Sequence, residues 1–538
     1  MKENNINSED PIKQMIGEQY KDTNNVYHII EGELSRGGQG VVFKTKDPKI
    51  LLKFKFNKDE NGNLTTPVFD KIEYEQFLEE IKKIKLLDLP GDLPIAKPEI
   101  ALGESNCGYL MKMIEDMMPL SELSEIKEKN ITEPFIESGG LKKRLLIFMK
   151  IAKIFITLQS RGVIYADLSF NNIFISAGKE NSEVWLIDAD NMRYSLDSIE
   201  NIYTQSIGAP EVVTGQSANT LFSDRFSFAV LLFYTLTLSH PMVGNMVENP
   251  GMSDNMGDEE DAWEEDDWDD EDGEDLDSEE DDWDSESDES EAGQEDNGRY
   301  ERAYRGEFPW VGDIEDSSNC QCDGIPMEYV INKELKELFQ KTFGREGISL
   351  PVERPDFTQW YKALKKAYDS LIECPECHST YYAHQKRCPF CNQEKDFPYY
   401  KVNILDSIHI KNLFLDMEIP DMSPEENKKN EFINEMVCTK YFIPSQTPQY
   451  LYRYHTDITT LDKELEKTIE FVFHPDGVIK IKNLDNTREI YVKNEEWYLV
   501  EPSQSIEVNI DQISTSMCRV DININEKCVR HIVIARGE

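Results

Sequence analysis

The sequence predicts an α+β protein of several domains, and three observations lead to this. First, 538 residues correspond to roughly three or four domains. Second, residues from about 25 to 115 alternate short apolar runs with one amphipathic stretch, whereas residues from about 138 to 370 carry mostly helical patterns. Third, the segment 400–538 has short alternating runs separated by turn residues, which predicts an all-β, sandwich-like module.

The net charge of -47 is concentrated in one tract. Asp258 to Asp296 holds 26 acidic residues in 39 positions and no basic residue. Such a segment repels itself and buries too little apolar area to offset its ordering entropy, so we expect a disordered insertion over 247–298. Acidity on this scale also disfavours phosphate backbones and anionic lipid as partners. We therefore expect neither nucleic acid nor membrane binding.

Two further patterns indicate a cytoplasmic protein. The longest nearly apolar stretch, Phe226 to Leu238, is too short to span a bilayer. The first residues, MKENNINSEDPIK, are polar and lack the apolar centre of a secretory signal. Ten cysteines in a chain of this length do not form a disulfide framework, and two C-x-x-C pairs among them indicate metal binding instead.

A glycine-rich segment lies between two predicted strands near the start of the chain. It reads Ser35-Arg36-Gly37-Gly38-Gln39-Gly40-Val41-Val42, and Lys53 follows on the next predicted strand. Glycines allow backbone N–H groups to approach phosphate closely, and a lysine supplies a positive charge to the phosphates. Alone, such a glycine-rich hairpin is more often a turn than a nucleotide clamp.

A second signal follows the amphipathic stretch Leu145 to Leu158. Asp167 precedes Asn172 by five residues, and Asp188 ends a later predicted strand. A phosphoryl-transfer site needs one carboxylate to orient a hydroxyl and an amide and a carboxylate to hold Mg²⁺. Downstream of the glycine-rich segment, these three residues favour such a site over three unrelated turns.

From about residue 25 to 372 the chain resembles the protein kinase family. The resemblance implies a bilobal kinase-like fold that binds ATP with Mg²⁺ or Mn²⁺. It implies catalytic roles for Lys53, Asp167, Asn172 and Asp188, with the last two as Mg²⁺ ligands. It also assigns ATP contacts to Gly37, Gly38, Gly40, Val42, Lys53, Glu80 and the hinge residues Met111 and Ile114.

Glu80 is the preferred helix partner of Lys53 because Ile84 and Leu87 then follow at helical spacing, but Glu79 and Glu75 remain open. Three further matches support the resemblance. Ala209-Pro210-Glu211 matches the motif that ends the activation segment, Asp224 matches the buried residue that braces the catalytic loop, and Arg354 matches the arginine that pairs with Glu211.

Three positions depart from the kinase pattern. Ala166 precedes Asp167 where an arginine usually stands, Ser169 replaces a lysine, and Asp190 ends the triplet Asp188-Ala189-Asp190 in place of a glycine. The departures weaken the prediction of fast transfer to Ser or Thr. A nucleotide-binding pseudokinase, or a scaffold acting through its acidic tract and β-module, is therefore the alternative.

The third signal is a pair of C-x-x-C turns, Cys374-Pro375-Glu376-Cys377 and Cys388-Pro389-Phe390-Cys391. Two such turns present four thiolates, the ligand set of a closed structural Zn²⁺ site. His378 and His384 are less favoured ligands because four cysteines already complete the shell. The ribbon follows the preceding helical pattern almost without a linker, so we expect it to pack on the C-lobe.

Together these patterns resemble a bacterial group of kinase-like proteins with a C-terminal zinc ribbon, related to kinases of tellurite-resistance, von Willebrand A and phosphatase systems. The resemblance implies a Ser/Thr-type kinase in bacterial signalling or stress response, with a protein substrate or signalling partner. We expect an N-lobe over 25–115, a C-lobe over 116–372, a zinc ribbon over 373–395 and the β-rich module over 400–538.

Overall fold

The chain divides into two compact units. The first comprises residues 1–131, 147–327 and 333–361, and the second comprises 132–146, 328–332 and 362–538. The computed structural model describes residues 11–37, 40–58, 64–65, 69–104, 106–124, 131–178, 182–248, 298–409, 432–457, 463–494, 496–513, 516–525 and 528–537. Nearly all of the acidic insertion predicted at 247–298 lies outside these residues, so its disorder stays a prediction.

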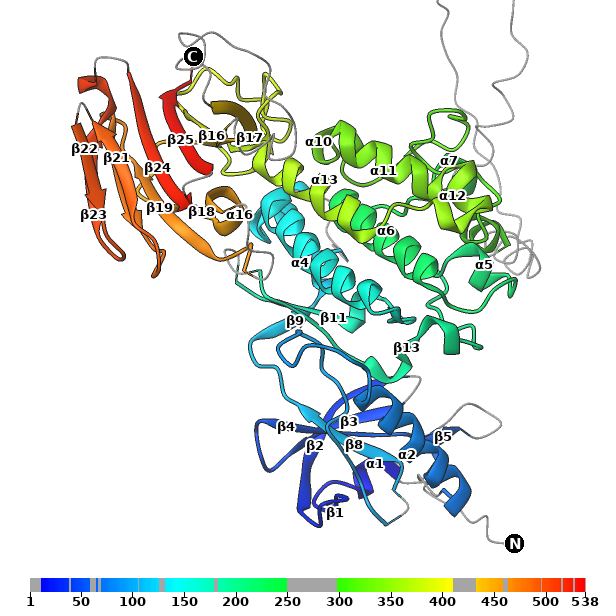
Figure 1. Ribbon diagram of the computed structural model, residues 1–538. Coiled ribbons are helices and arrows are strands. Elements are labelled where there is room, and N and C mark those ends of the chain that lie inside the picture. The colour runs from blue at the N-terminus through cyan, green and yellow to red at the C-terminus, as the bar shows by residue number, and fades with distance from the viewer. Residues whose placement is uncertain are drawn as a thin grey trace, which may run out of the picture. The chain divides into compact units, whose positions relative to one another are not determined.

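The first unit begins with a six-stranded antiparallel sheet in the order β1-β2-β3-β4-β8-β7 (Figure 1). Helix α2 (Lys71–Lys85) starts at a capping box in which Asp70 accepts from two backbone N–H groups. The other elements of this part are α1 (Pro11–Gln14), β1 (Gln19–Lys21), β2 (Tyr27–Gly37), β3 (Gly40–Thr45), β4 (Ile50–Phe54), the short pair β5 (Asn57–Lys58) and β6 (Leu64–Thr65), β7 (Ile100–Ala101) and β8 (Gly108–Lys112).

The two faces of this sheet bury different side chains because neighbouring residues of a strand point to opposite faces. Phe77 and Ile81 of α2 pack with Leu51 of β4 on one face. Leu52 and Phe54 of the same strand belong to the cluster on the other face, with Ile12 and other residues. Lys53 therefore shares the α2 face with Leu51.

Helices dominate the next part of the first unit. Helix α6 (Leu221–Thr237) is buried along almost its whole length and begins at a capping box formed by Thr220 and Ser223. The rest comprises η1 (Leu120–Leu123), α4 (Gly140–Ser160), η2 (Phe170–Asn172), η3 (Ala189–Asn191), η4 (Ser195–Asp197), α5 (Pro210–Val213), α7 (Asn245–Glu248), α11 (Lys333–Phe343), α12 (Arg345–Ser349), η5 (Pro351–Glu353) and α13 (Phe357–Asp369). Both α4 and α13 continue into the second unit.

Two small sheets accompany these helices. One has the order β12-β11-β9 and the other pairs β10 with β13. Their bounds are β9 (Met117–Pro119), β10 (Val163–Ile164), β11 (Ile173–Ser176), β12 (Val184–Leu186) and β13 (Arg193–Tyr194). The turns between these strands carry Asp167, Asn172 and Asp188, three of the four residues that the sequence predicts for catalysis.

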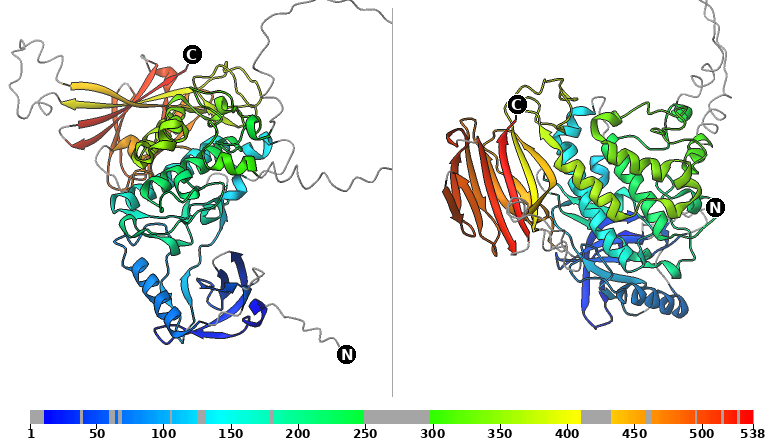
Figure 2. Two further views of the ribbon diagram at one scale, coloured as in Figure 1. Left: turned by 90° about the vertical axis from the view of Figure 1, so that its right-hand side faces the viewer. Right: turned by 45° about the horizontal axis from the view of Figure 1, so that its top comes forward.

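The second unit contains the two cysteine turns and two larger antiparallel sheets, which Figure 2 shows from two further sides. The sheets have the orders β17-β16-β25-β24-β21-β22 and β18-β19-β20-β23. Apolar residues of both sheets, such as Val402, Ile534, Phe471 and Ile481, form one buried cluster. This arrangement is a sandwich around a shared core.

The strands of the second unit are β14 (Leu371–Glu373), β15 (Thr380–Tyr382), β16 (Tyr400–His409), β17 (Phe432–Phe442), β18 (Gln449–Tyr452), β19 (Lys467–Phe473), β20 (Val478–Asn483), β21 (Ile490–Asn494), β22 (Glu496–Val500), β23 (Ser505–Asn509), β24 (Met517–Asn525) and β25 (Cys528–Arg536). Its short helices are α3 (Thr132–Glu137), α10 (Met327–Val330), α16 (Arg453–Thr456) and η6 (Ile510–Gln512). None of the helices described in either unit has the length and apolarity that crossing a bilayer requires.

Candidate active site

The glycine-rich segment forms the hairpin between β2 and β3, where Gly37 and Gly40 are cross-strand partners. A Cβ on Gly40 would overlap the carbonyl oxygen of Phe54, so close packing against β4 requires glycine there. A Cβ on Gly37 would meet no atom nearer than 4.0 Å. Gly38 lies outside the described residues. The predicted ATP contacts of these glycines stay predictions.

Lys53 lies in β4 opposite Val42 of β3 and opposite Tyr109 of β8. Its side chain is 7% exposed, and its Nζ forms ion pairs with Asp188 and with Asp190, the latter at 2.6 Å. Burial lowers the pKa of Lys53, but the charges of Asp190 and Asp188 outweigh this and raise it. The ammonium is therefore held charged between two carboxylates.

The structure does not bring Glu80 to Lys53. Glu80 is exposed on α2, next to Glu79, which pairs with Lys82 of the same helix at 3.4 Å. Glu75 is also exposed and lies 3.7 Å from Lys71. The alignment of Lys53 by a glutamate of this helix thus stays a prediction, and two aspartates hold the lysine instead.

Asp167 and Asn172 lie on the loop between β10 and β11. The Nδ2 of Asn172 donates to the backbone oxygen of Asp167 at 2.9 Å and to its Oδ2 at 3.3 Å. Burial raises the pKa of Asp167, although the bond from Asn172 and the charge of Lys53 act in the opposite direction. The amide of Asn172 thus orients the carboxylate of Asp167, a contact that the sequence analysis did not predict.

Asp188 follows β12 with a left-handed backbone, φ 59°, which directs the chain into the turn η3. The N–H of Ile187 donates to the carbonyl oxygen of Asn172 at 2.9 Å, so the two residues predicted to hold Mg²⁺ lie at the same end of the paired strands β11 and β12. Burial raises the pKa of Asp188 more than the charge of Lys53 lowers it. Carboxylate and amide oxygens are ligand types that suit Mg²⁺.

Asp224 of α6 braces the loop that carries Asp167. Its two carboxylate oxygens accept from the backbone N–H groups of Tyr165 at 2.8 Å and of Ala166 at 3.1 Å. Ala166 has φ 72°, a strained backbone that these bonds help to hold. Burial raises the pKa of Asp224 to about 7. The role expected for Asp224 from the sequence is confirmed.

The predicted hinge residues lie at the end of β8. Met111 is buried and pairs with Leu51 of β4, while Ile114 is half-buried just beyond the strand. The N–H of Met113 donates to the carbonyl oxygen of Lys49 at 2.8 Å. The hinge is therefore joined to the strand that carries Lys53, and its contact with adenine stays a prediction.

Asn219 ties the predicted activation segment to the loop that carries Asp167. Its side chain accepts from the N–H of Ile202 at 2.8 Å and donates to the carbonyl oxygens of Ile202 at 2.7 Å and Ala166 at 3.3 Å. Asn219 is 3% exposed. The neutral side-chain amide of Asn219 is thus bonded to Ala166, the residue that stands where kinases usually have an arginine.

His240 holds the same segment closer to its end. Its Nε2 donates to the carbonyl oxygen of Ser206 at 2.7 Å, and its Nδ1 accepts from the N–H of Met242 at 3.1 Å. These partners require the neutral ring, and burial lowers the pKa of His240 to about 4. The hydroxyl of Ser227 donates to the next carbonyl, that of Ile207, at 3.0 Å. Nothing in the sequence near these residues indicates the contacts.

The segment ends at Glu211, which forms a bidentate pair with Arg354. Both Nη atoms of Arg354 donate to Glu211 at 2.8 Å, and its Nε donates to the carbonyl oxygen of Gly347 at 2.8 Å. The Arg354 side chain has no exposed surface. The pairing that we expected from the sequence is confirmed.

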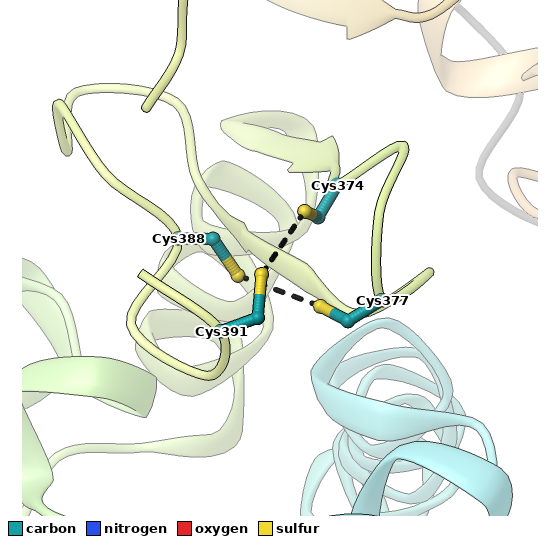
Figure 3. Close-up of side chains that lie close together, drawn as sticks. All are labelled: Cys374, Cys377, Cys388 and Cys391. Carbon is teal, nitrogen blue, oxygen red and sulfur yellow. Dashed lines mark hydrogen bonds between the residues drawn. The ribbon is translucent and has the colours of Figure 1, made fainter. Parts of the chain in front are cut away.

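The two cysteine turns repeat one geometry. In the first, the residue after the second cysteine, His378, has φ 57° and donates its N–H to the carbonyl oxygen of Cys374 at 3.0 Å. In the second, Asn392 has φ 62° and donates to Cys388 at 2.8 Å. The two turns are thus equivalent and present their thiols toward one another (Figure 3).

The four thiols fit a tetrahedral Zn²⁺ site. All four Sγ atoms lie within 4.8 Å of one another, with Cys374 3.6 Å from Cys391 and Cys377 3.7 Å from Cys388. Zn–S bonds of about 2.3 Å in a tetrahedron place sulfurs about 3.8 Å apart. His378 instead lies 3.4 Å from Glu373, and His384 stacks on Tyr382.

A second cluster, which the sequence analysis missed, surrounds Asp369 at the end of α13. Its Oδ1 accepts from Tyr454 at 2.6 Å, His455 at 3.0 Å and Lys440 at 3.3 Å. The thiol of Cys438 lies close enough to complete a possible ligand set. The ammonium of Lys440 already neutralises Asp369, so we interpret the cluster as a buried structural network.

The comparisons with known proteins point to kinases. No family model matches the chain. The serine/threonine-protein kinase PknD of Protochlamydia amoebophila (strain UWE25) is 25% identical over 239 residues, which are 40% of this chain and 23% of the relative. PknD of Chlamydia caviae is 28% identical over 239 residues, 40% of this chain and 24% of the relative.

The match therefore spans about a quarter of the length of these curated relatives. The similarity is distant, but it agrees with the site described above, in which Lys53, Asp167, Asn172 and Asp188 follow one another along the chain in the order that the kinase pattern predicts. Together, the distant similarity to serine/threonine-protein kinases supports a protein kinase-like chain.

Proposed function

We propose that the chain is an ATP- and Mg²⁺-dependent protein kinase of the Ser/Thr type with an atypical catalytic loop. One observation carries this proposal: a single half-buried site brings together four residues that are widely spaced along the chain. Lys53 forms an ion pair with Asp188, Asn172 donates a hydrogen bond to Asp167, and the charge of Lys53 lowers the pKa of Asp167 against the effect of burial. Phosphoryl transfer depends on such positioning and charge and requires little covalent chemistry from the protein.

Each residue has one role in this proposal. Lys53 binds the α and β phosphates of ATP, and the strand pair β2–β3 covers them. Asn172, whose Nδ2 donates to Asp167, offers its amide oxygen to Mg²⁺ together with the carboxylate of Asp188. The metal neutralises charge on the phosphates when it is bound.

Asp167 orients the hydroxyl of the protein substrate toward the γ-phosphorus. The hydroxyl oxygen forms the new P–O bond as the bond to the β-phosphate oxygen breaks, ADP leaves, and the hydroxyl proton passes to Asp167. Burial raises the pKa of Asp167, which favours its accepting this proton. The bond from Asn172 keeps the carboxylate in place.

The remaining parts serve structure and partners. Cys374, Cys377, Cys388 and Cys391 hold a structural Zn²⁺, whose four thiolate ligands leave no position for water. The β-module binds a signalling partner or substrate. We place the protein in the bacterial cytoplasm, in a signalling or stress response, on the resemblance alone.

A pseudokinase or scaffold is the second candidate, and a specific observation favours it. Ser169, which stands where kinases keep a lysine for the transferred phosphate, is buried as the residue preceding η2. No cation is therefore supplied from this position. In that reading nucleotide binding sets the shape of the chain and no phosphate is transferred.

Incubation of the pure protein with labelled ATP, Mg²⁺ or Mn²⁺ and a general protein substrate tests the proposal. We expect incorporation that Asp167→Asn abolishes. Thermal unfolding with Mg·ATP runs in parallel, since a ligand of the folded state adds about 2.7 kcal/mol at a hundredfold excess over Kd. A thermal shift without transfer would favour the pseudokinase, and the absence of both would refute the nucleotide site.

A further inference from the structure

The ammonium of Lys53 needs a buried anion, because removing a charge from water is costly unless a counter-charge replaces the solvent. The acidic residues of α2 do not supply it. Glu80 is exposed, and Glu75 and Glu79 pair with lysines of their own helix. The carboxylates that reach Lys53 in the described structure belong to Asp188 and Asp190.

Asp190 lies in the turn η3, two residues after Asp188 and beyond the end of β12. Its Oδ2 accepts from Lys53 Nζ at 2.6 Å, and its Oδ1 accepts from the hydroxyl of Tyr109. Each carboxylate oxygen therefore has its own donor. The turn itself is fixed because Ala189 is fully buried and its carbonyl accepts from the N–H of Met192 at 3.2 Å.

The register of the sheet explains why the two donors converge. Lys53 of β4 and Tyr109 of β8 are directly opposite in an antiparallel pair, so their side chains project from the same face. Tyr109 is 3% exposed, and burial raises its pKa well above the ordinary value, which keeps it a neutral donor. The sheet thus presents an ammonium and a hydroxyl side by side to one carboxylate.

We propose that Asp190, together with Tyr109, is the positioning residue of Lys53 in this chain, in place of a glutamate from α2. This inference rests on the proposed function, which gives Asp188 to Mg²⁺. A bound metal would offset much of the negative charge of Asp188 and weaken it as the counter-ion of the lysine, so a second carboxylate is needed for that role. Asp190 leaves Asp188 available for the metal.

The proposal has a consequence for regulation. Lys53, Tyr109 and Asp190 come from the sheet and from the segment after β12, and none of them belongs to α2. The alignment of the lysine is then independent of any inward movement of this helix. A partner that bound α2 would not switch the lysine on or off.

Two double-mutant cycles on the full-length protein without nucleotide test the contact itself. One combines Lys53→Met with Asp190→Asn, and the other combines Lys53→Met with Glu80→Gln as the matched comparison. We expect the Lys53–Asp190 cycle to show a coupling of about tenfold or more in the unfolding equilibrium constant, as for a charge-assisted bond. We expect no coupling for Lys53–Glu80.

The second readout is Mg·ATP turnover, separated into kcat and KM. Asp190→Asn should lower kcat/KM about ten- to a hundredfold, the loss expected for one charge-assisted bond, and Asp190→Glu should restore part of it. Tyr109→Phe should give a smaller loss in the same direction. This milder variant keeps the test valid if Asp190→Asn does not fold.

Coupling of Lys53 to Glu80 that equals or exceeds its coupling to Asp190 would overturn the inference. So would normal turnover in both Asp190→Asn and Tyr109→Phe. If the wild type neither binds nor turns over Mg·ATP, the proposed function fails, and the two cycles still decide which residue anchors the lysine.

Discussion

Replacement of Arg354 by methionine tests whether a buried ion pair fixes the end of the predicted activation segment. The guanidinium donates to Glu211 through both Nη atoms, to the carbonyl oxygen of Gly347, and to that of Phe222 at 3.1 Å. It also lies 4.9 Å from the centre of the Phe226 ring. Methionine fills similar space and removes every polar contact.

The expected loss follows from burial. Glu211 is 11% exposed, so without Arg354 its carboxylate stays largely desolvated and uncompensated. Removing one partner of a buried pair costs about 3–5 kcal/mol. Replacing both residues, as in Arg354→Met with Glu211→Leu, removes the orphaned charge and should cost less than Arg354→Met alone.

A matched control comes from the surface. Arg302 and Glu307 lie at the same 2.8 Å, but their side chains are 55% and 42% exposed. Solvent screens this pair, so Arg302→Met should cost less than about 1 kcal/mol. The two ion pairs have the same distance, but they differ in burial and in the two carbonyl contacts that Arg354 makes in addition.

Urea unfolding followed by tryptophan fluorescence measures these differences. Trp310 and Trp360 are fully buried in the aromatic core that contains Phe343, and Phe343 also packs on Phe226 beneath Arg354. With a slope of about 3 kcal/mol per molar urea, a loss of 4 kcal/mol lowers the midpoint by about 1.3 M. If Arg354→Met lowered it no more than Arg302→Met, or if the double variant were the least stable, the argument from burial would be wrong.

Three other outcomes are expected. Burial lowers the pKa of His240 in the folded state to about 4, from the ordinary 6.5. Between these two pH values the unfolded state therefore binds more protons than the folded state. The free energy of unfolding should fall by roughly 3 kcal/mol as the pH drops from 6.5 to 4. Denaturant unfolding across this window should show a shallower fall in His240→Asn, and an unchanged one would contradict the assignment. Elemental analysis should find one Zn²⁺ per chain, and almost none in a Cys374→Ser, Cys391→Ser variant that still binds ATP; a metal-free wild type would exclude the site. Replacing Thr204 and Ser206 with alanine should leave turnover within a few-fold. Asn219 and His240 hold the predicted activation segment through backbone carbonyl oxygens, which alanine retains. A loss of turnover as large as that of Asp167→Asn would show that phosphorylation of this segment is needed.

Local patterns predicted much of the fold. The apolar run Phe226 to Leu238 lies almost entirely within α6, because a continuous apolar stretch of that length is buried and Thr220 caps it. The cysteine spacing predicted the cluster of four thiols, because both turns are closed by bonds within five residues. Asp224 and Arg354 were predicted from motif position, and their partners are those expected.

The contacts that the sequence did not predict are non-local. The spacing of α2 made Glu80 a reasonable partner for Lys53, but spacing does not determine which face of a helix turns toward a sheet. The sequence marked Asp190 only as a departure from the kinase pattern, because its contact with Tyr109 joins segments that are far apart in the chain. The same holds for Asn219 and for the network around Asp369, whose partners are joined only by tertiary packing.

The packing of the cysteine turns limits how this chain can be divided. Within the second unit, the ring of Phe390 stacks on Phe135 at 5.8 Å and meets Tyr329 at 6.1 Å, while Tyr382 donates to the carbonyl oxygen of Val330 at 2.8 Å. These partners precede the first cysteine by many residues. A shortened protein ending at 372 would expose the fully buried Phe135 to water and would be prone to aggregate. The cysteine turns are therefore part of the packing of the second unit, and a fragment that keeps Phe135 covered must extend beyond Phe390.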